Sequence, residues 1–352
     1  MIPEKRVLMK RTLPFLLVGL LIFIAYLYFF VNIPKMIATF KGINLFYYSL
    51  AVVVLLLNAV FSALVWQYFL RPLSINVSFR KTFLFDFIGT FVDILVPAES
   101  ISGDASKAYL MSKDSGEDAG KVVASVVGYR ILSMIITLSS LIIGSTSLFI
   151  LQYKLPLFVL NLILLVAIGT TISLVFLFLL CSKEQLTQKI IDSLLRFSNF
   201  LLRGRLKLTS LRSKTREALR AFYQSIEFLG GNLRSLVWPV VFSVVAWLLS
   251  VLLSFFVFVS LDHPISFSVV LIVYSISCAI QTIPVGVPAE VGLIEIVMTS
   301  LYAMLGVPIG ISAAATVLIR IITVWFKFFM GFVAFQWVGI KVLTGSSRQP
   351  SN

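Results

Sequence analysis

Long apolar stretches separated by short polar ones dominate the pattern of this chain. An α-helix needs roughly 20 apolar residues to cross a bilayer. Six stretches are long enough, at about residues 13–31, 45–69, 122–150, 157–181, 236–261 and 309–338. The pattern therefore predicts an all-α, polytopic integral membrane protein with about six crossing helices.

Two further apolar segments, at about 83–112 and 267–306, are interrupted by polar residues, proline and glycine. The second contains Pro284, Gly286, Pro288 and Gly292, and proline removes a backbone donor and blocks a regular helical turn. Broken backbone at membrane depth is tolerated only where protein or water covers it. We therefore predict that each segment forms a re-entrant hairpin.

The two hairpins share a short motif. Val96-Pro97-Ala98-Glu99 matches Val287-Pro288-Ala289-Glu290 at an offset of 191 residues, and Asp104 matches Glu295 at the same offset. Paired interrupted segments in corresponding halves of a chain indicate a transporter's binding site. Together with the charge pattern, the motif predicts two inverted repeats, at 45–150 and 236–338, within a single membrane domain at 1–352.

Charge supports this topology. The chain has 352 residues, of which 12% are charged, against about 25% in a typical soluble domain. The net charge of +14 follows from Lys and Arg in loops that we assign to the cytoplasm, so it does not indicate nucleic acid. Eleven Lys and Arg lie in the linker 183–235, which we expect to form amphipathic helices on anionic lipid. Both termini are predicted to be cytoplasmic, in the cell membrane.

The acidic residues of the hairpins are candidate site residues, because ionisable groups at membrane depth are costly and usually mark a pathway. Glu290 and Glu295 flank Gly292 in the second hairpin, and Glu99 and Asp104 occupy the first. They are expected to contact a cationic group, a proton or a hydroxyl-rich head group. The alternative is that the hairpin tips reach water and the acids are solvated.

Basic residues are the other candidates. Arg130 and Arg320 follow their hairpins by similar distances, and a guanidinium suits a lipid phosphate. Alternatively, each arginine pairs with a hairpin acid and only stabilises the fold. Lys107 and Tyr109 are expected to contact a head group from the inner leaflet. Lys327 lies on the face of Arg320 and either adds a phosphate contact or extends its amine to the membrane surface.

Other residues carry less information. Asp86 and Asp93 are expected to line the first hairpin's cavity or to cap it near water. Three tryptophans are interpreted as interfacial anchors, namely Trp66, Trp238 and Trp337. With one histidine, two scattered cysteines and no nucleotide-binding loop, we expect no metal, no cofactor and no ATP coupling.

Two runs resemble motifs of a known family. Gly103-Asp104-Ala105-Ser106-Lys107-Ala108-Tyr109-Leu110 resembles the early Gly-acid-x-x-basic-x-Tyr-Leu motif of the lysylphosphatidylglycerol synthase transmembrane family, also called flippase-like. Pro284 to Glu295, with Arg320-Ile321-Ile322-Thr323-Val324-Trp325 downstream, resembles its late motif. The chain departs from the family where Lys107 replaces the usual arginine and where Pro288-Ala289-Glu290 replaces a more glycine-rich turn.

The resemblance implies a polytopic protein with two inverted hairpin repeats that moves lipids or lipid-linked sugars between leaflets. Some family members carry a soluble aminoacyl-transferase domain after the last span. We expect no such activity here, because the sequence ends shortly after Val338.

The sequence thus predicts a translocase, not an enzyme, for a phospholipid or glycolipid whose head group passes between the hairpins. Two alternatives stay open, an intramembrane head-group transferase and a small-ion transporter. Which lipid is moved, in which direction, and whether the chain forms a homodimer are left open.

Overall fold

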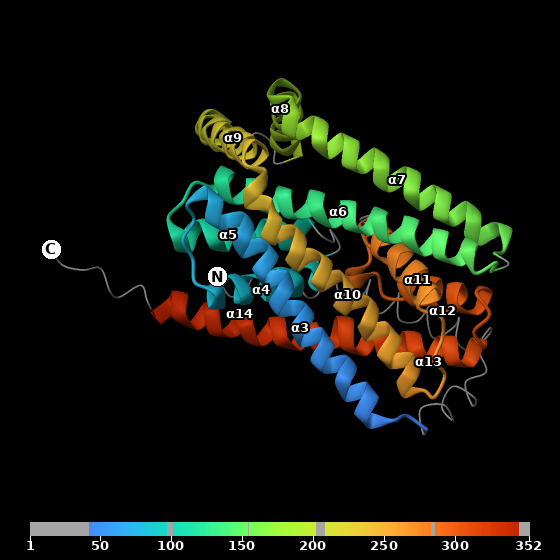
Figure 1. Ribbon diagram of the computed structural model, residues 1–352. Helices are drawn as coiled ribbons and strands as arrows, with labels where there is room; N and C mark the ends of the chain where they lie inside the picture. The colour runs from blue at the N-terminus through green and yellow to red at the C-terminus, as the bar shows by residue number, and fades with distance from the viewer. Residues whose placement is uncertain (1–41, 97–100, 154, 202–207, 283–285, 345–352) are drawn as a thin grey trace.

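The computed structural model describes residues 42–96, 101–153, 155–201, 208–282 and 286–344, and these ranges are helical, without β-strands. Five helices in them are long and apolar enough to cross a membrane (Figure 1). They confirm five of the six predicted crossing helices, whereas the one at 13–31 lies outside the described residues. The five comprise α3 (Leu45–Leu70) with η1 (Arg71–Leu73), α6 (Ala119–Ile150), α7 (Leu157–Ser182), η2 (Leu233–Leu236) with α10 (Val237–Ser260), and α13 (Ile309–Arg320) continued by η4 (Ile321–Phe326) and α14 (Lys327–Thr344).

The two interrupted segments fold as helical hairpins. The first consists of α4 (Phe79–Leu95) and α5 (Ile101–Ser115), and the second of α11 (Phe267–Ile280), η3 (Pro288–Glu290) and α12 (Leu293–Met304). The arms have 17, 15, 14 and 12 residues. At about 1.5 Å per residue they are shorter than the ~30 Å hydrocarbon core, so no arm is long enough to cross a bilayer.

The hairpins occupy opposite ends of the bundle and meet near its middle. In Figure 1, α4 and α5 lie toward one end of α6, beside α14, whereas α11 and α12 lie toward the other end, where α12 contacts α13. Helix α4 contacts η3 at the tip of the second hairpin. At this contact Ile94 buries its side chain with Ala289, Val291 and Val324. Because this contact joins both tips, the space between the hairpins lies inside the protein.

Helices α3 and α10 pack side by side along much of their lengths (Figure 1). Inside this interface the Asn58 Nδ2 donates to the Ala246 carbonyl at 2.7 Å and to Ser250 Oγ at 2.9 Å. Hydrogen bonds of this kind between membrane helices are worth about 0.6 kcal/mol on average. Asn58 therefore fixes how the two helices align more than it adds to stability.

Trp66 corrects one prediction. Its indole is fully buried, and Nε1 donates to Ser125 Oγ on α6 at 3.1 Å. The prediction of an interfacial anchor is therefore wrong for Trp66, because α6 packs on α3 at this level and covers the ring. Trp238 and Trp337 remain about half exposed.

The basic linker forms α8 (Glu184–Leu201) and α9 (Leu208–Gly231), which lie toward the end of the molecule that carries α5 (Figure 1). Helix α9 packs on α6. The close approach occurs at Gly120, where an added Cβ would overlap the Ala218 carbonyl oxygen and lie 2.9 Å from Phe222 N. Gly120 therefore lets the backbone of α9 lie directly on the start of α6.

Gly120→Ala is expected to loosen α9 from α6, at a cost of about 1–3 kcal/mol, since both obstructing atoms are backbone. The measurement is the rate of limited proteolysis within α9, together with the midpoint of thermal unfolding in detergent. Gly230→Ala is the matched control, because a Cβ there meets no atom within 4 Å. Equal proteolysis of the two variants would contradict this close packing.

Candidate functional site

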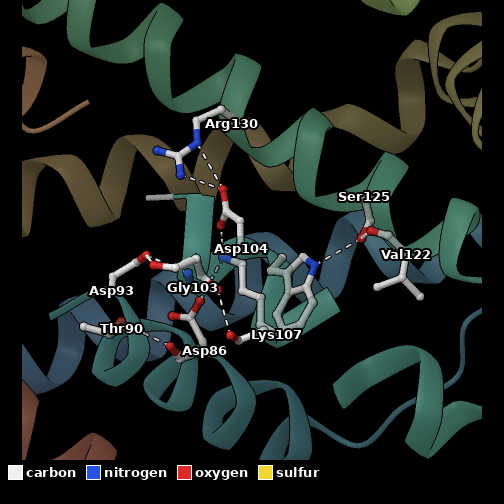
Figure 2. Close-up of polar contacts among 12 residues, drawn as sticks. Asp86, Thr90, Asp93, Gly103, Asp104, Lys107, Val122, Ser125 and Arg130 are labelled. Atoms are coloured by element: carbon white, nitrogen blue, oxygen red, sulfur yellow. Dashed lines mark hydrogen bonds and ion pairs between the residues drawn. The ribbon is translucent and has the colours of Figure 1, made fainter. Parts of the chain in front are cut away.

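A network of charged side chains holds the first hairpin against α6 (Figure 2). Asp104, in the first turn of α5, accepts from Arg130 Nη2 at 2.6 Å and from Arg130 Nε at 3.2 Å through Oδ2. Its Oδ1 lies 3.0 Å from Lys107 Nζ. A carboxylate in the first turn of a helix is also favoured by the helix dipole. Asp104 therefore joins two cations from two helices.

Lys107 is buried at the centre of this network. Its Nζ lies 3.3 Å from Asp86 Oδ1, and it lies 5.2 Å and 4.8 Å from the ring centroids of Trp66 and Tyr129. Both distances fall within the range of a cation–π contact. The amine thus has carboxylate and aromatic partners on α3, α4, α5 and α6, so its position favours joining the helices over meeting a head group.

Asp93 fixes the turn between the two arms of the first hairpin. Its Oδ1 accepts from the Gly103 backbone N at 2.6 Å and from Ser102 Oγ at 2.9 Å. A carboxylate that accepts from free backbone donors at a helix start acts as a cap. Figure 2 shows Asp93 and Asp86 of α4 facing α5, Asp93 at Gly103 and Asp86 at Lys107.

The second hairpin has a corresponding pair. Glu295 accepts from Arg320 Nε at 2.6 Å through Oε1 and from the Gly292 backbone N at 2.7 Å through Oε2. Gly292 has φ of 93° and precedes α12, so the residue there must adopt a conformation that favours glycine. Arg320 Nη2 donates to the Ala289 carbonyl at 2.5 Å. The arginine thus ties the hairpin tip to α13.

The tip of the second hairpin is also strained. Ala289 and Glu290 both have positive φ, at 51° and 50°. Left-handed residues other than glycine cost of order 1 kcal/mol or more and persist where surrounding contacts enforce them. The Arg320 contact to Ala289 and the full burial of Glu290 provide that enforcement.

The two pairs correspond in the chain but differ in access to solvent. Each joins an acid in the first turn of a hairpin's second arm to an arginine in the next long helix, and the acids are 191 residues apart. The side chains of Arg130 and Asp104 are 26% and 19% exposed, whereas those of Arg320 and Glu295 are 6% and 7% exposed. The pair at the first hairpin is therefore accessible, and the pair at the second is sealed.

Of the five predicted site residues outside these pairs, Lys107 contacts Asp104 and Gly292 contacts Glu295, which leaves three others. Tyr109 is 64% exposed, and its ring centroid lies 6.0 Å from Lys113 Nζ. Glu290 is buried in η3. Glu99 falls outside the described residues. Both arginines adopt the acid-paired arrangement that the sequence left as one alternative.

A central cavity of about 300 Å³ lies between the hairpins. Its charged lining residues are Asp93 from α4, Arg320 from α13 and Lys327 from α14. The other lining side chains with polar atoms are uncharged. They lie on α3, α4, α10, α11 and η4 or directly after α11, namely Asn58, Thr90, Ser250, Ser254, Tyr274, Ser277, Cys278, Gln281 and Thr323. The cavity is therefore polar although it lies among apolar helices.

This cavity continues toward the bundle surface. A second cavity of about 190 Å³ shares three lining residues with it, namely Tyr274, Cys278 and Gln281. A third, of about 530 Å³, lies between α5, α6 and α7 and shares Arg130, Met134 and Thr282 with the second. Leucine, valine, phenylalanine and alanine form most of its lining. An apolar groove at Arg130 and the central cavity thus lie on either side of one smaller cavity that adjoins both.

Sequence reasoning missed most of the polar lining. Serine, threonine and tyrosine occur throughout membrane helices, so nothing in the sequence marks Ser254, Ser277 and Tyr274 as residues that line a cavity. Asn58 offered one, because an amide inside an apolar span usually faces protein or water. Trp66 and Tyr129 offered none, since aromatic rings are common in such spans.

Comparison with known proteins places this architecture among membrane proteins. Three relatives are named UPF0104 membrane proteins. The first, PH1989 of Pyrococcus horikoshii, is 26% identical to this chain over an alignment that covers 80% of this chain and 84% of the relative. The second, from Methanothermobacter thermautotrophicus, is 27% identical over 84% and 86% of the two chains, and MJ1595 of Methanocaldococcus jannaschii is 25% identical over 91% and 93%. No solved structure matches the chain significantly. The model of the lysylphosphatidylglycerol synthase TM region matches residues 16–331, and this chain therefore belongs to that family of multi-pass membrane proteins linked to lipid handling.

Proposed function

We propose that this protein moves a lipid between the leaflets of the cell membrane. The head group passes through the central cavity while the chains stay in the apolar groove and the bilayer. The observation that carries the proposal is that an apolar groove between α5, α6 and α7 and a polar cavity between the hairpins both adjoin one smaller cavity, which shares lining residues with each. An amphipathic ligand needs both environments joined, which a small ion does not.

The arrangement of the hairpins supports this proposal. The two short hairpins meet where α4 contacts η3, and Ile94, Ala289, Val291 and Val324 are buried together there. In transporters with inverted repeats, one repeat moves against the other around a fixed site. We place the repeats at 45–150 and 236–338, with the hairpins entering from opposite faces of the membrane.

The unequal access of the two ion pairs fits one state of such a cycle. The Asp104–Arg130 pair borders the open groove, whereas the Glu295–Arg320 pair is sealed. The basic helices α8 and α9 lie toward the end that carries the accessible pair. Because cytoplasmic segments are rich in Lys and Arg, that end faces the cytoplasm, with both termini on the same side.

Thr282→Trp is expected to reduce lipid exchange at least about ten-fold, because Thr282 lines both the groove and the passage to the centre. An indole there fills the route while the exposed position leaves the core unchanged. The measurement is leaflet exchange of fluorescent phospholipids and glycolipids in liposomes containing the full chain.

Thr171→Trp is the matched control, since Thr171 is an exposed threonine on α7 and lines none of these three cavities. It should keep the wild-type exchange rate. If wild-type protein exchanges no lipid faster than empty liposomes, the translocase proposal fails. If both tryptophan variants exchange lipid at the wild-type rate, the proposed route is wrong.

A further inference from the structure

Lys327 occupies a distinctive position in the central cavity. It is the first residue of α14 and directly follows η4, a π-helical segment at Ile321–Phe326. Such segments are rare and occur frequently at functional sites. Arg320 precedes the segment and Lys327 follows it, and both line the central cavity. The irregular turn thus lies between the cavity's two cations.

The two cations differ in their partners. Arg320 is neutralised by Glu295 and also donates to the Ala289 carbonyl. Within the described part of the chain, no carboxylate lies within ion-pair distance of Lys327 Nζ, and Lys327 makes no side-chain hydrogen bond. Arg320 therefore uses its charge and donors within the protein, whereas the Lys327 amine is available to a ligand.

The nearby acids do not change this contrast. Asp93 lines the same cavity, but its carboxylate accepts from Ser102 and Gly103. Asp86 interacts with Lys327 electrostatically but forms no ion pair with it, and its Oδ1 lies 3.3 Å from Lys107 Nζ. A cation away from bulk water requires a counter-charge. The cavity thus presents one ammonium group without a close counter-ion in the region that the structure describes.

We propose that Lys327 binds the phosphate group of an anionic lipid during its passage through the central cavity. An ammonium group is an effective phosphate ligand, and about 300 Å³ admits a phosphate with a small polyol. Hydroxyl groups of Thr323, Ser277 and Tyr274 line the same space and suit a hydroxyl-rich head group. A head group with a quaternary ammonium is disfavoured, because Lys327 repels it.

The lipid part of this inference rests on the proposed function, whereas the anion site can be tested by binding alone. The experiment titrates the full chain in nonionic detergent with dihexanoyl phosphatidylglycerol, with a phosphate-free dihexanoyl glucosyl glycerol and with inorganic phosphate. Wild-type protein should bind the phosphate lipid at least about ten-fold more tightly than the glucolipid. Equal affinities would overturn the proposal without any variant.

Lys327→Gln should weaken binding of the phosphate lipid at least about ten-fold and leave the glucolipid unchanged, whereas Lys327→Arg should retain it. The matched control is Lys189→Gln, which removes the same charge from the exposed surface of α8. If Lys189→Gln weakens binding as much as Lys327→Gln, the lipid binds the basic surface and the proposal is wrong.

Two results separate the site from translocation. Phosphate-selective binding that depends on Lys327, without leaflet exchange in liposomes, supports the anion site and removes the translocase function. Leaflet exchange of phosphatidylglycerol that is unaffected by Lys327→Gln overturns the anion site and keeps the function. Inorganic phosphate binding as tightly as the lipid would contradict a lipid ligand.

Discussion

Arg320→Met is expected to lower the free energy of unfolding by about 3–5 kcal/mol, the largest effect predicted for this protein. The substitution leaves the Glu295 carboxylate buried without its guanidinium partner. In the wild type, Arg320 Nε lies 2.6 Å from Glu295 Oε1. It also removes the bond from Arg320 to the Ala289 carbonyl, which holds the strained tip of the second hairpin. The measurement is equilibrium unfolding in mixed micelles, followed by helix content.

The double variant Arg320→Met with Glu295→Gln tests the cause. Replacing both charges should recover part of the loss, because no buried carboxylate then remains uncompensated. Arg130→Met is the comparison at the first hairpin, where the pair is partly exposed and Asp104 keeps Lys107. It should cost about 1 kcal/mol. Equal losses at the two arginines would contradict the difference in burial.

Gly103→Ala is expected to destabilise the first hairpin by about 3 kcal/mol or more, at the upper end for an overpacked position. An added Cβ would overlap Asp93 Oδ2 and the Gly89 carbonyl oxygen, and these lie on the facing helix α4. The Asp93 carboxylate would have to move, and its bond to the Gly103 backbone N would be lost or weakened. The hairpin arms would separate beside Asp93, which lines the central cavity.

Thermal unfolding in detergent measures this loss. Gly169→Ala is the control, because it also lies within a helix and an added Cβ meets no atom within 4 Å. There, alanine should be neutral or slightly stabilising, since it favours helix more than glycine by about 1 kcal/mol. A Gly103→Ala variant as stable as Gly169→Ala would show that α4 and α5 do not pack as described.

Several features of the fold followed from the sequence because they depend on local properties. Runs of apolar residues gave the five described crossing helices, since length and hydropathy alone decide whether a helix can span a bilayer. Proline and glycine at 284–292 indicated a broken segment, and the structure has a hairpin there. The matching positions of Asp104 and Glu295, and of Arg130 and Arg320, indicated corresponding charged sites but left pairing with a hairpin acid as one of two alternatives.

Tertiary packing decided what each polar side chain contacts. The sequence predicts an interfacial anchor at Trp66, but α6 covers its ring. It predicts that Lys107 contacts a head group, but the Lys107 amine is buried among partners on four helices. Arg320 and Lys327 lie seven residues apart in the sequence, yet only one has a carboxylate partner in the described structure. Hydropathy and spacing report what a helix presents on each face. The distances between helices, set by close approaches such as that of Gly103 to α4, determine which of those groups pair and which line the cavity.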